Sequence, residues 1–451
     1  MASSKIAPQL QPTLLARVAE ARARTDALFQ LLPPNSFYDR PVAERHRLIF
    51  YLGHLEAFDW NLLSHALELD TQHAEFDKLF AFGIDPIGGG LPADAPGDWP
   101  GIAQVEKYNR QTRSRLDAAL QGPQGQARSP ESSLADGTLL NVAIEHRLMH
   151  AETLAYLLHN LPLERKIPQP HAHCDPHPAP RPRQVTIPAG VATLGQTRKE
   201  PHTFGWDNEF DALQISVPSF SIDVFPVTNS EYLKFIRAGG YENQAYWSPE
   251  DWEWKREHRL EHPHFWLPRS SSPATDPDTQ WEYRAMFGTI PLPQSWPVYV
   301  SHAEASAFAR WARRKLPTEA QWHRAANGTA QGTEQAYPWG DELPRPAHGN
   351  FHFQRWDAAP VDAFPAGASK FGVFDLLGNG WEWTSTPFAP LPGFQPFPFY
   401  PGYSADFFDG KHFVMKGGSP RTDACMARRS FRNWFQPHYP YVYATFRCVE
   451  D

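Results

Sequence analysis

Two histidines one helical turn apart are the first residues in this sequence whose spacing suggests chemistry. His146 and His150 stand at positions i and i+4, so on a helix both imidazoles would lie on one face. A third histidine, His54, stands in another segment with helical period. The three could bind one metal ion; the alternative is that the helices simply pack histidine among their apolar residues.

The ligand types restrict the metal. Three neutral imidazoles with open coordination positions suit Fe(II), Zn(II) or Cu, and ligand softness does not choose among these ions. No cysteine stands near the three histidines in the sequence, which argues against a closed structural zinc site. Glu152 follows His150 by two residues and cannot closely share its face. We therefore expect Glu152 to be an outer carboxylate that orients an imidazole N–H or a neighbouring helix.

The histidines are expected to lie on two helices of a four-helix bundle. Residues 136–161 contain no proline, and leucine and alanine recur there at helical spacing. Other helices are predicted over residues 13–32, 45–69 and 102–120. Bundles build metal sites from side chains that facing helices direct inward. The arginines of the third helix fit a solvated face; they are Arg110, Arg113 and Arg115.

The second half of the chain has a different character. From Gln184 onward, short strands and turns are punctuated by aromatic residues. We predict an α+β protein with a helical bundle over residues 1–161, a proline-rich linker over 162–183 and a loop-rich domain over 184–451. The linker carries His171, His173, Cys174 and His177. So many prolines favour an ordered crossover over a metal-binding tract.

Composition restricts the class of protein further. A chain of 451 residues with 41% hydrophobic residues is long enough for two or three cores. A net charge of -8 gives no electrostatic reason to expect binding to nucleic acid or to an anionic membrane. No apolar run is long enough to cross a bilayer, and no signal peptide is evident. Three cysteines fit a reducing compartment, so we expect a cytoplasmic location.

An ordered series of motifs marks the second half. It comprises P-V-T-N at 226–229, L-P-T-E-A-Q-W at 316–322, Y-P-W-G at 337–340, G-N-x-W-E-W at 378–383 and G-G-S at 417–419. This series resembles the formylglycine-generating-enzyme family, whose fold is similar to a C-type lectin. The copper-dependent oxidases of that family carry a cysteine pair after G-G-S. Here Thr422 and the isolated Cys425 cannot supply two thiolates, so that oxidase activity is not expected.

The whole chain, with its bundle carrying His54 and H-x-x-x-H-x-E, resembles the ergothioneine-type sulfoxide synthases. The resemblance implies that His54, His146 and His150 hold Fe(II). It also implies that O2 drives attachment of a thiol to C2 of the imidazole of hercynine (trimethylhistidine). Asn433 and Trp434 match positions that contact hercynine.

Aromatic residues near the C-terminus could complete such a site. Trp434 and Phe435 could hold the quaternary ammonium of hercynine against their faces, or they could be domain core. Asn433 could hydrogen-bond the substrate carboxylate, or cap a turn. A tyrosine is expected to donate a proton during the reaction, and Tyr403 and Tyr441 are the candidates.

Departures from the best-known branch concern the donor. That branch binds gamma-glutamylcysteine and has Gln and Asp where this chain has Met149 and Phe435. The chain looks more like the selenoneine synthases, which use a selenosugar. Asp85, Asp94 and Asp98 could offer carboxylates to sugar hydroxyls, although a solvated flexible loop is the simpler explanation.

Two other functions stay open. One is sulfoxide synthesis from cysteine or gamma-glutamylcysteine. The other is a non-enzymatic binding module in which a metal stabilises the bundle and the lectin-like domain recognises a ligand.

Overall fold

The computed structural model describes residues 13–81, 92–122, 134, 136–170, 177–198, 204–269 and 280–451. The chain divides into two compact units. Unit 1 comprises residues 1–155 and 164–167, and unit 2 comprises residues 156–163 and 168–451. No helix in the described ranges is both long and apolar enough to cross a lipid bilayer.

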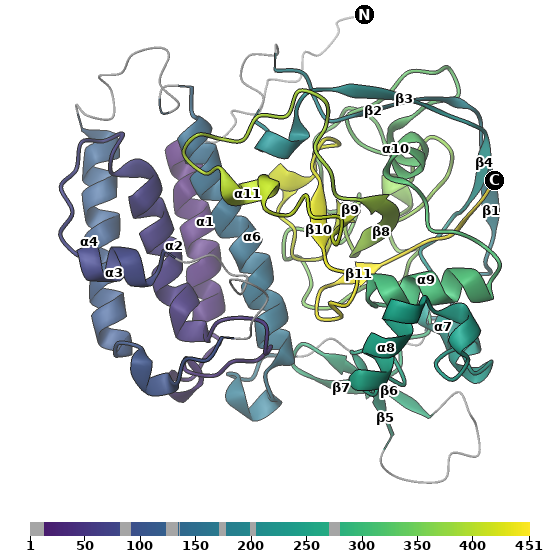
Figure 1. Ribbon diagram of the computed structural model, residues 1–451, viewed down its shortest axis with the longest axis horizontal. Coiled ribbons are helices and arrows are strands. Elements are labelled where there is room, and N and C mark those ends of the chain that lie inside the picture. Colours follow the sequence, from purple (N-terminus) through teal and green to yellow (C-terminus); the bar gives the residue numbers. More distant parts are fainter. Residues whose placement is uncertain are drawn as a thin grey trace, which may run out of the picture. The chain divides into compact units, whose positions relative to one another are not determined.

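Unit 1 is helical (Figure 1). Its helices are α1 (Leu14–Phe29), α2 (Leu48–Leu63), α3 (Ala74–Leu79), α4 (Ile102–Gln121) and α6 (Thr138–Asn160), whose last turn belongs to unit 2. The four long helices form where hydrophobic periodicity predicts them. The short helix α3 lies in a segment for which the sequence analysis predicts no helix.

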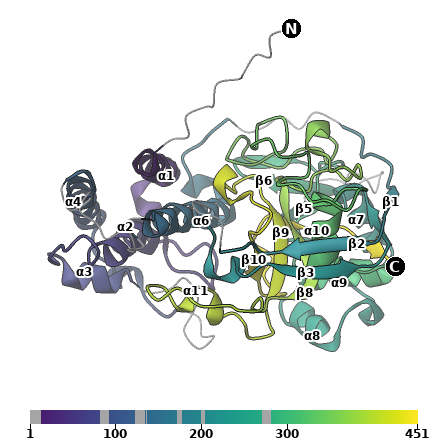
Figure 2. The same ribbon diagram turned by 90° about the horizontal axis from the view of Figure 1, so that it is seen from above.

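Local sequence explains where these helices begin and how they pack. The Thr13 hydroxyl accepts a hydrogen bond from the Ala16 amide and caps α1, and Pro33 and Pro34 follow its C-terminal end. Helix α2 packs against α3 and α4, and Figure 2 shows it in the middle of the unit. A helix in that position is buried on nearly every side, which accounts for its almost uninterrupted apolar sequence.

Unit 2 is built from small sheets and short helices (Figure 1). A four-stranded sheet has the order β10-β9-β8-β11, formed by β8 (Gly380–Pro387), β9 (Phe413–Gly418), β10 (Asn433–Phe435) and β11 (Ala444–Thr445). Strand β10 runs antiparallel to β9, with Trp434 opposite Val414.

The other sheets are smaller. One has the order β1-β4-β12, from β1 (Gln184–Ile187), β4 (Phe220–Asp223) and β12 (Val449–Glu450). Another pairs β2 (Gly190–Leu194) with β3 (Leu213–Val217), and the last has the order β5-β6-β7, from β5 (Trp266–Pro268), β6 (Trp281–Ala285) and β7 (Gly288–Pro291). The helices are α7 (Asn229–Arg237), α8 (Pro249–Glu257), α9 (His302–Trp311), α10 (Glu319–Asn327) and α11 (Gly402–Ala405). A helical unit followed by a sheet-containing unit confirms the predicted α+β class.

Several of the family motifs of unit 2 are helix starts. Thr228 of P-V-T-N and Thr318 of L-P-T-E-A-Q-W are the N-caps of α7 and α10. In each case the threonine hydroxyl accepts from the amide three residues on, and the side chain of that residue bonds back to the threonine amide. These are capping boxes, which satisfy amides that a helix end leaves unpaired.

Other motifs meet in one buried ion pair. The Arg447 Nε and Nη2 atoms donate to the two carboxylate oxygens of Glu382, both at 2.6 Å. The indole Nε1 of Trp322 donates to Glu382 Oε2 at 3.0 Å. These bonds join β8, α10 and the segment before β12, so the motifs G-N-x-W-E-W and L-P-T-E-A-Q-W help to hold the fold together.

Candidate metal centre

The structure brings His54 of α2 together with His146 and His150 of α6 in the interior of unit 1. Their ligand atoms all lie within 4.8 Å of one another. The Nε2 atom of His150 is 3.2 Å from that of His54 and 3.1 Å from that of His146. All three side chains are buried. The i, i+4 spacing on α6 and a facing helix therefore produce the convergent trio that the sequence predicts.

A backbone carbonyl fixes the ring of His54. The Nδ1 atom of His54 lies 2.7 Å from the carbonyl oxygen of Phe80, the residue that ends α3. A carbonyl can only accept, so Nδ1 carries the proton and Nε2 presents its lone pair to the other two histidines. An imidazole that binds a metal commonly donates its second nitrogen in this way.

Aromatic rings surround the histidines. Phe50 stacks on His54 with ring centroids 4.8 Å apart, and Phe58 stacks on His146 at 3.4 Å. The Tyr51 ring lies 5.9 Å from that of His150. From the sequence alone, these residues would be assigned to the hydrophobic core. Their contacts with the histidines depend on how α2 and α6 face each other, which the sequence does not show. They keep water from the rings on the sides that they cover.

The chemistry of this cluster fits a metal ion. Burial lowers the pKa of His54 to about 4, and it lowers the pKa values of His146 and His150 well below the ordinary value. The rings are therefore neutral near pH 7. Nitrogen atoms about 3 Å apart must share either a proton or a cation, because two lone pairs repel. A divalent cation where the Nε2 atoms converge satisfies all three.

The three candidate hercynine-binding residues form strand β10 in unit 2: Asn433 and Trp434, which the resemblance assigns, and Phe435, proposed from its aromatic ring. Trp434 is half-buried and stacks on Phe388, with centroids 4.1 Å apart and an interplanar angle of 8°. The Phe435 ring stacks on that of Tyr439 at 5.3 Å. The Asn433 side-chain oxygen accepts from the Trp434 amide at 2.9 Å. Substrate contact by these residues stays a prediction.

The two candidate proton donors also lie in unit 2. Tyr403 is buried and stacks on Trp206, with centroids 3.9 Å apart. The Tyr441 ring packs edge-on against those of His264 and Tyr439. Glu152, predicted to be an outer carboxylate, is half-buried on α6. The catalytic and orienting roles of these residues stay predictions.

Two of the three acidic residues considered for sugar binding have other partners. Both carboxylate oxygens of Asp94 are engaged: Arg40 pairs with one, and Arg47 Nε and the Trp99 indole reach the other at 2.9 and 2.8 Å. Asp98 accepts from the Ala95 amide at 2.6 Å. Asp94 is therefore a structural residue. Asp85 lies outside the described residues.

The histidine and cysteine tract of the linker is described at only one position. His171, His173 and Cys174 lie outside the described residues. His177 Nε2 is 3.0 Å from Asp362 Oδ1, at an exposed position of unit 2. This contact is an ion pair when the imidazole is protonated.

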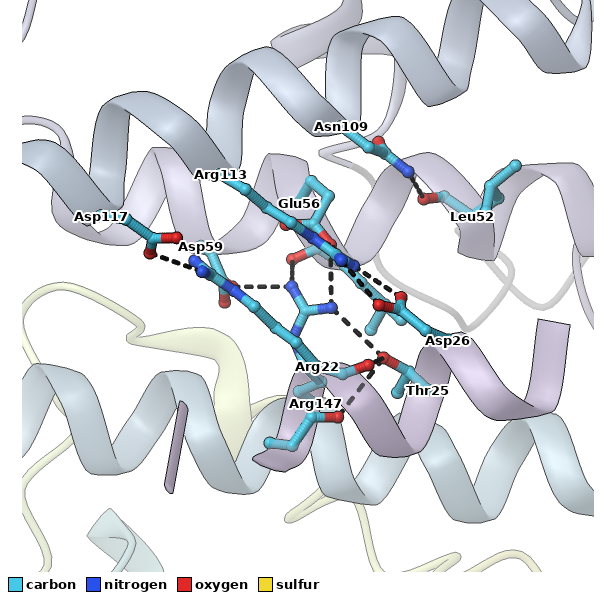
Figure 3. A network of polar contacts seen from close by, with 12 residues as sticks. Arg22, Thr25, Asp26, Leu52, Glu56, Asp59, Asn109, Arg113, Asp117 and Arg147 are labelled. Carbon is cyan, nitrogen blue, oxygen red and sulfur yellow. Dashed lines mark hydrogen bonds and ion pairs between the residues drawn. The ribbon is translucent and has the colours of Figure 1, made fainter. Parts of the chain in front are cut away.

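Beside the histidines lies a network of buried charges that the sequence analysis does not anticipate (Figure 3). Arg147 of α6 donates to Glu56 and Asp59 of α2. Arg113 of α4 donates to Glu56 and, with two nitrogens, to Asp26 of α1. The prediction of a solvated face is therefore wrong for Arg113. It holds for Arg110, whose side chain is 70% exposed.

Comparison with known proteins agrees with this architecture. Residues 17–154 match the DinB superfamily, and residues 170–451 match the sulfatase-modifying factor enzyme 1-like domain. A DinB bundle with a three-histidine cluster, followed by this domain, defines the ergothioneine-type sulfoxide synthases. The chain belongs to that family.

Individual relatives support the assignment. The chain is 38% identical over 322 residues to the hercynine oxygenase of Mycolicibacterium smegmatis, and the aligned region covers 69% of this chain and 71% of the relative. It is 36% identical over 357 residues to the hercynine oxygenase of Mycolicibacterium thermoresistibile, covering 77% and 75%. It is 28% identical over 506 residues to ergothioneine biosynthesis protein 1 of Neurospora crassa, covering 94% of this chain and 56% of the relative. The chain thus spans about half of the fungal protein.

Proposed function

We propose that this protein is a non-haem Fe(II) enzyme that uses O2 to couple a chalcogen donor to C2 of the imidazole ring of hercynine. The observation that carries the proposal is the buried, neutral cluster of His54, His146 and His150. It occurs in a chain whose relatives include hercynine oxygenases. Iron held by three imidazoles supplies redox chemistry with O2 and keeps coordination positions open for substrates.

The residues of unit 1 would bind and enclose the metal. The three Nε2 atoms face one another as ligands, and the Phe80 carbonyl holds the His54 ring in the tautomer that offers Nε2. Phe50 and Phe58 cover two of the rings and exclude water from them. Low solvent access strengthens the interaction between a cation and its ligands.

The residues of strand β10 would recognise hercynine. Hercynine carries a quaternary ammonium group, which binds to aromatic faces through cation–π attraction. Trp434 belongs to an aromatic cluster with Phe388, Tyr403 and Phe407. Asn433 offers an amide that can hydrogen-bond the substrate carboxylate. This assignment rests on the family resemblance together with the chemistry of the cluster.

For the donor we favour a selenosugar, which would make the product selenoneine. Two positions depart from the branch that binds gamma-glutamylcysteine: Met149 precedes His150, and Phe435 follows Trp434. Phe435 stacks on Tyr439 and brings no charge or polar group, so neither position helps to bind a dianionic peptide. Because the carboxylate of Asp94 is already bonded to Arg40, Arg47 and Trp99, it no longer supports sugar binding. The choice of a selenosugar therefore rests on these two departures and on the resemblance to the selenoneine synthases. The alternative is sulfoxide synthesis from cysteine or gamma-glutamylcysteine.

One assay tests both the iron-dependent coupling to hercynine and the choice of a selenosugar as donor. Metal-free protein is loaded with Fe(II) without oxygen and then given O2 and hercynine with cysteine, gamma-glutamylcysteine or a selenosugar in parallel. Mass spectrometry of the products should show a C–Se product with the selenosugar and none when His146 is replaced by Ala. Sulfoxide from cysteine alone would exclude the selenium donor and leave the iron site standing. Tightly held zinc and no oxygen consumption with any donor would instead indicate a binding module.

A further inference from the structure

We propose that Arg147, Glu56 and Asp59 form a positioning device that sets the spacing of α2 and α6, and thereby the geometry of the three histidines. The inference rests on the metal binding contained in the proposed function. It concerns residues that neighbour the ligands in the sequence and act through the helices that carry them.

The bonds of Arg147 connect the two ligand-bearing helices directly. Its Nη1 donates to Glu56 Oε1 at 2.9 Å, and its Nη2 donates to Asp59 Oδ2 at 2.7 Å. Nη2 also donates to the carbonyl of Leu55 at 2.9 Å. The guanidinium is planar and rigid, so three acceptors on α2 fix α6 in both distance and register.

The ligands and the ion pairs are neighbours in the sequence. Arg147 directly follows His146 on α6, and Glu56 stands two residues after His54 on α2. Both residues of α2 reach α6: His54 Nε2 lies 3.2 Å from His150 Nε2, and Glu56 accepts from Arg147 at 2.9 Å. A shift of α6 along α2 would therefore break the ion pairs and separate the imidazoles together.

The rest of the network supports the carboxylates from outside, as Figure 3 shows. Arg113 of α4 donates through Nε and Nη2 to Glu56 Oε1, at 3.0 and 2.7 Å. Arg22 of α1 pairs with Asp117 at 2.6 Å and approaches Asp59 at 3.9 Å. Glu56 thus faces two guanidinium groups, that of Arg113 at 2.7 Å and that of Arg147 at 2.9 Å.

If the cluster acts through its charge, its variants should change the metal affinity in different directions from those expected if it positions the helices. Removing the Arg147 cation leaves its surroundings more negative, which by charge alone would strengthen the binding of a divalent cation. Removing the Glu56 charge would weaken it by charge alone. If the cluster positions the helices, both changes weaken metal binding, and Arg147→Lys weakens it too although the charge is kept.

The test uses the full chain, freed of metal, and titrates it with Co2+. The d–d spectrum of Co2+ reports the coordination of the ion while the titration gives its dissociation constant. We expect Glu56→Gln, Arg147→Met and Arg147→Lys to weaken binding by about 10–100-fold, the range for groups that orient metal ligands, and to alter the spectrum. The matched control is Asp117→Asn, which also turns one carboxylate of the network into an amide but leaves the bonds of Arg147 in place. It should change the dissociation constant less than threefold.

Several outcomes would overturn the inference. Tighter binding by Arg147→Met would assign the cluster a charge effect. A second outcome is that the three variants bind Co2+ with the affinity and spectrum of the wild type and differ from it only in a lower free energy of unfolding. That result would show that the cluster has a structural role and does not position the ligands. If Glu56→Gln and Arg147→Met do not fold, Arg147→Lys decides, since it keeps the cation. If the wild type is active and the variants bind Co2+ as tightly as it does, this inference is wrong but the proposed function is not affected. A wild type that binds no metal would sink the proposed function with it.

Discussion

At the scale of single residues, Gly53 and Phe80 together determine how His54 is presented. The ring of Phe80 packs so closely against Gly53 that a Cβ there would lie 2.6 Å from its carbon atoms. The carbonyl of the same Phe80 accepts from His54 Nδ1. A glycine directly before the ligand thus allows the close approach that supplies the orienting carbonyl.

Replacing Gly53 by Ala should therefore weaken metal binding. The methyl group would push Phe80 away and lengthen the bond between its carbonyl and His54. We expect a dissociation constant about 10–100-fold higher, as for other losses of an orienting partner, measured by the same Co2+ titration. Gly97→Ala is the control, because a Cβ at residue 97 meets nothing within 4 Å. Equal affinities for the two variants would contradict this role.

The three histidines themselves give a sharper prediction. His54→Ala, His146→Ala and His150→Ala should each abolish stoichiometric iron binding and leave circular dichroism nearly unchanged, since unit 2 has its own core. Glu152→Gln should weaken iron binding less, by about 10–100-fold. Iron analysis after gel filtration measures both. Full iron content in any alanine variant would remove that histidine from the ligand set, and complete loss in Glu152→Gln would make Glu152 a ligand.

At the scale of elements, His302 links helix α9 to the β10-β9-β8-β11 sheet of unit 2. Its ring stacks on Phe413 at the start of β9, and its Nε2 donates to the Thr384 carbonyl of β8 at 3.2 Å. Burial, with smaller contributions from the charges of Arg310 and His438, lowers the pKa of His302 to about 4. The Asp251 carboxylate and the hydrogen bond to Thr384 oppose the shift.

This depressed pKa predicts a loss of stability in acid. Above pH 6.5 both folded and unfolded states hold His302 neutral, and it contributes nothing to pH dependence. Between pH 6.5 and 4 only the unfolded chain takes up the proton, so the free energy of unfolding falls, by about 2 kcal/mol at pH 5. Denaturant unfolding of metal-free His302→Gln should show a smaller decrease between pH 7 and 5 than that of wild type. Parallel curves would contradict the assignment.

Prediction from sequence succeeds for some elements and fails for others, for physical reasons. The helices α2 and α6 and their histidines follow from hydrophobic period and i, i+4 spacing, which are local properties. The stacking of Phe58 on His146 and the bonds of Arg113 join residues from different helices. Those contacts depend on how each helix is rotated about its axis relative to its neighbours, which the local sequence pattern does not determine. Strand β10, of three residues, is too short to show a period of its own.

At the scale of the whole molecule, the proposed function assigns metal binding and substrate recognition to different units of the chain. The histidine cluster lies in unit 1, and the strand assigned to hercynine lies in unit 2. The two tasks should therefore respond independently to mutation, even though turnover needs both.

Trp434→Leu tests this separation. The variant should bind iron like wild type but bind hercynine about 2–30-fold more weakly, which corresponds to a cation–π contribution of roughly 0.5–2 kcal/mol. Calorimetric titration with hercynine and iron analysis of the same sample measure the two effects. Trp339→Leu is a matched control from the same unit, because Trp339 stacks instead on Tyr337 and His348. Loss of iron in Trp434→Leu would show that the tasks are not separate.

The neutral three-imidazole cluster also has a consequence for handling the protein. Without thiolate or carboxylate ligands, its affinity for divalent ions should follow the general order in which zinc and copper bind more tightly than ferrous iron. A sample grown in ordinary medium and purified in air would then tend to carry zinc, whatever ion serves in the cell. The metal found on isolation would record the composition of the medium, and an inactive preparation would say more about its loading history than about the protein.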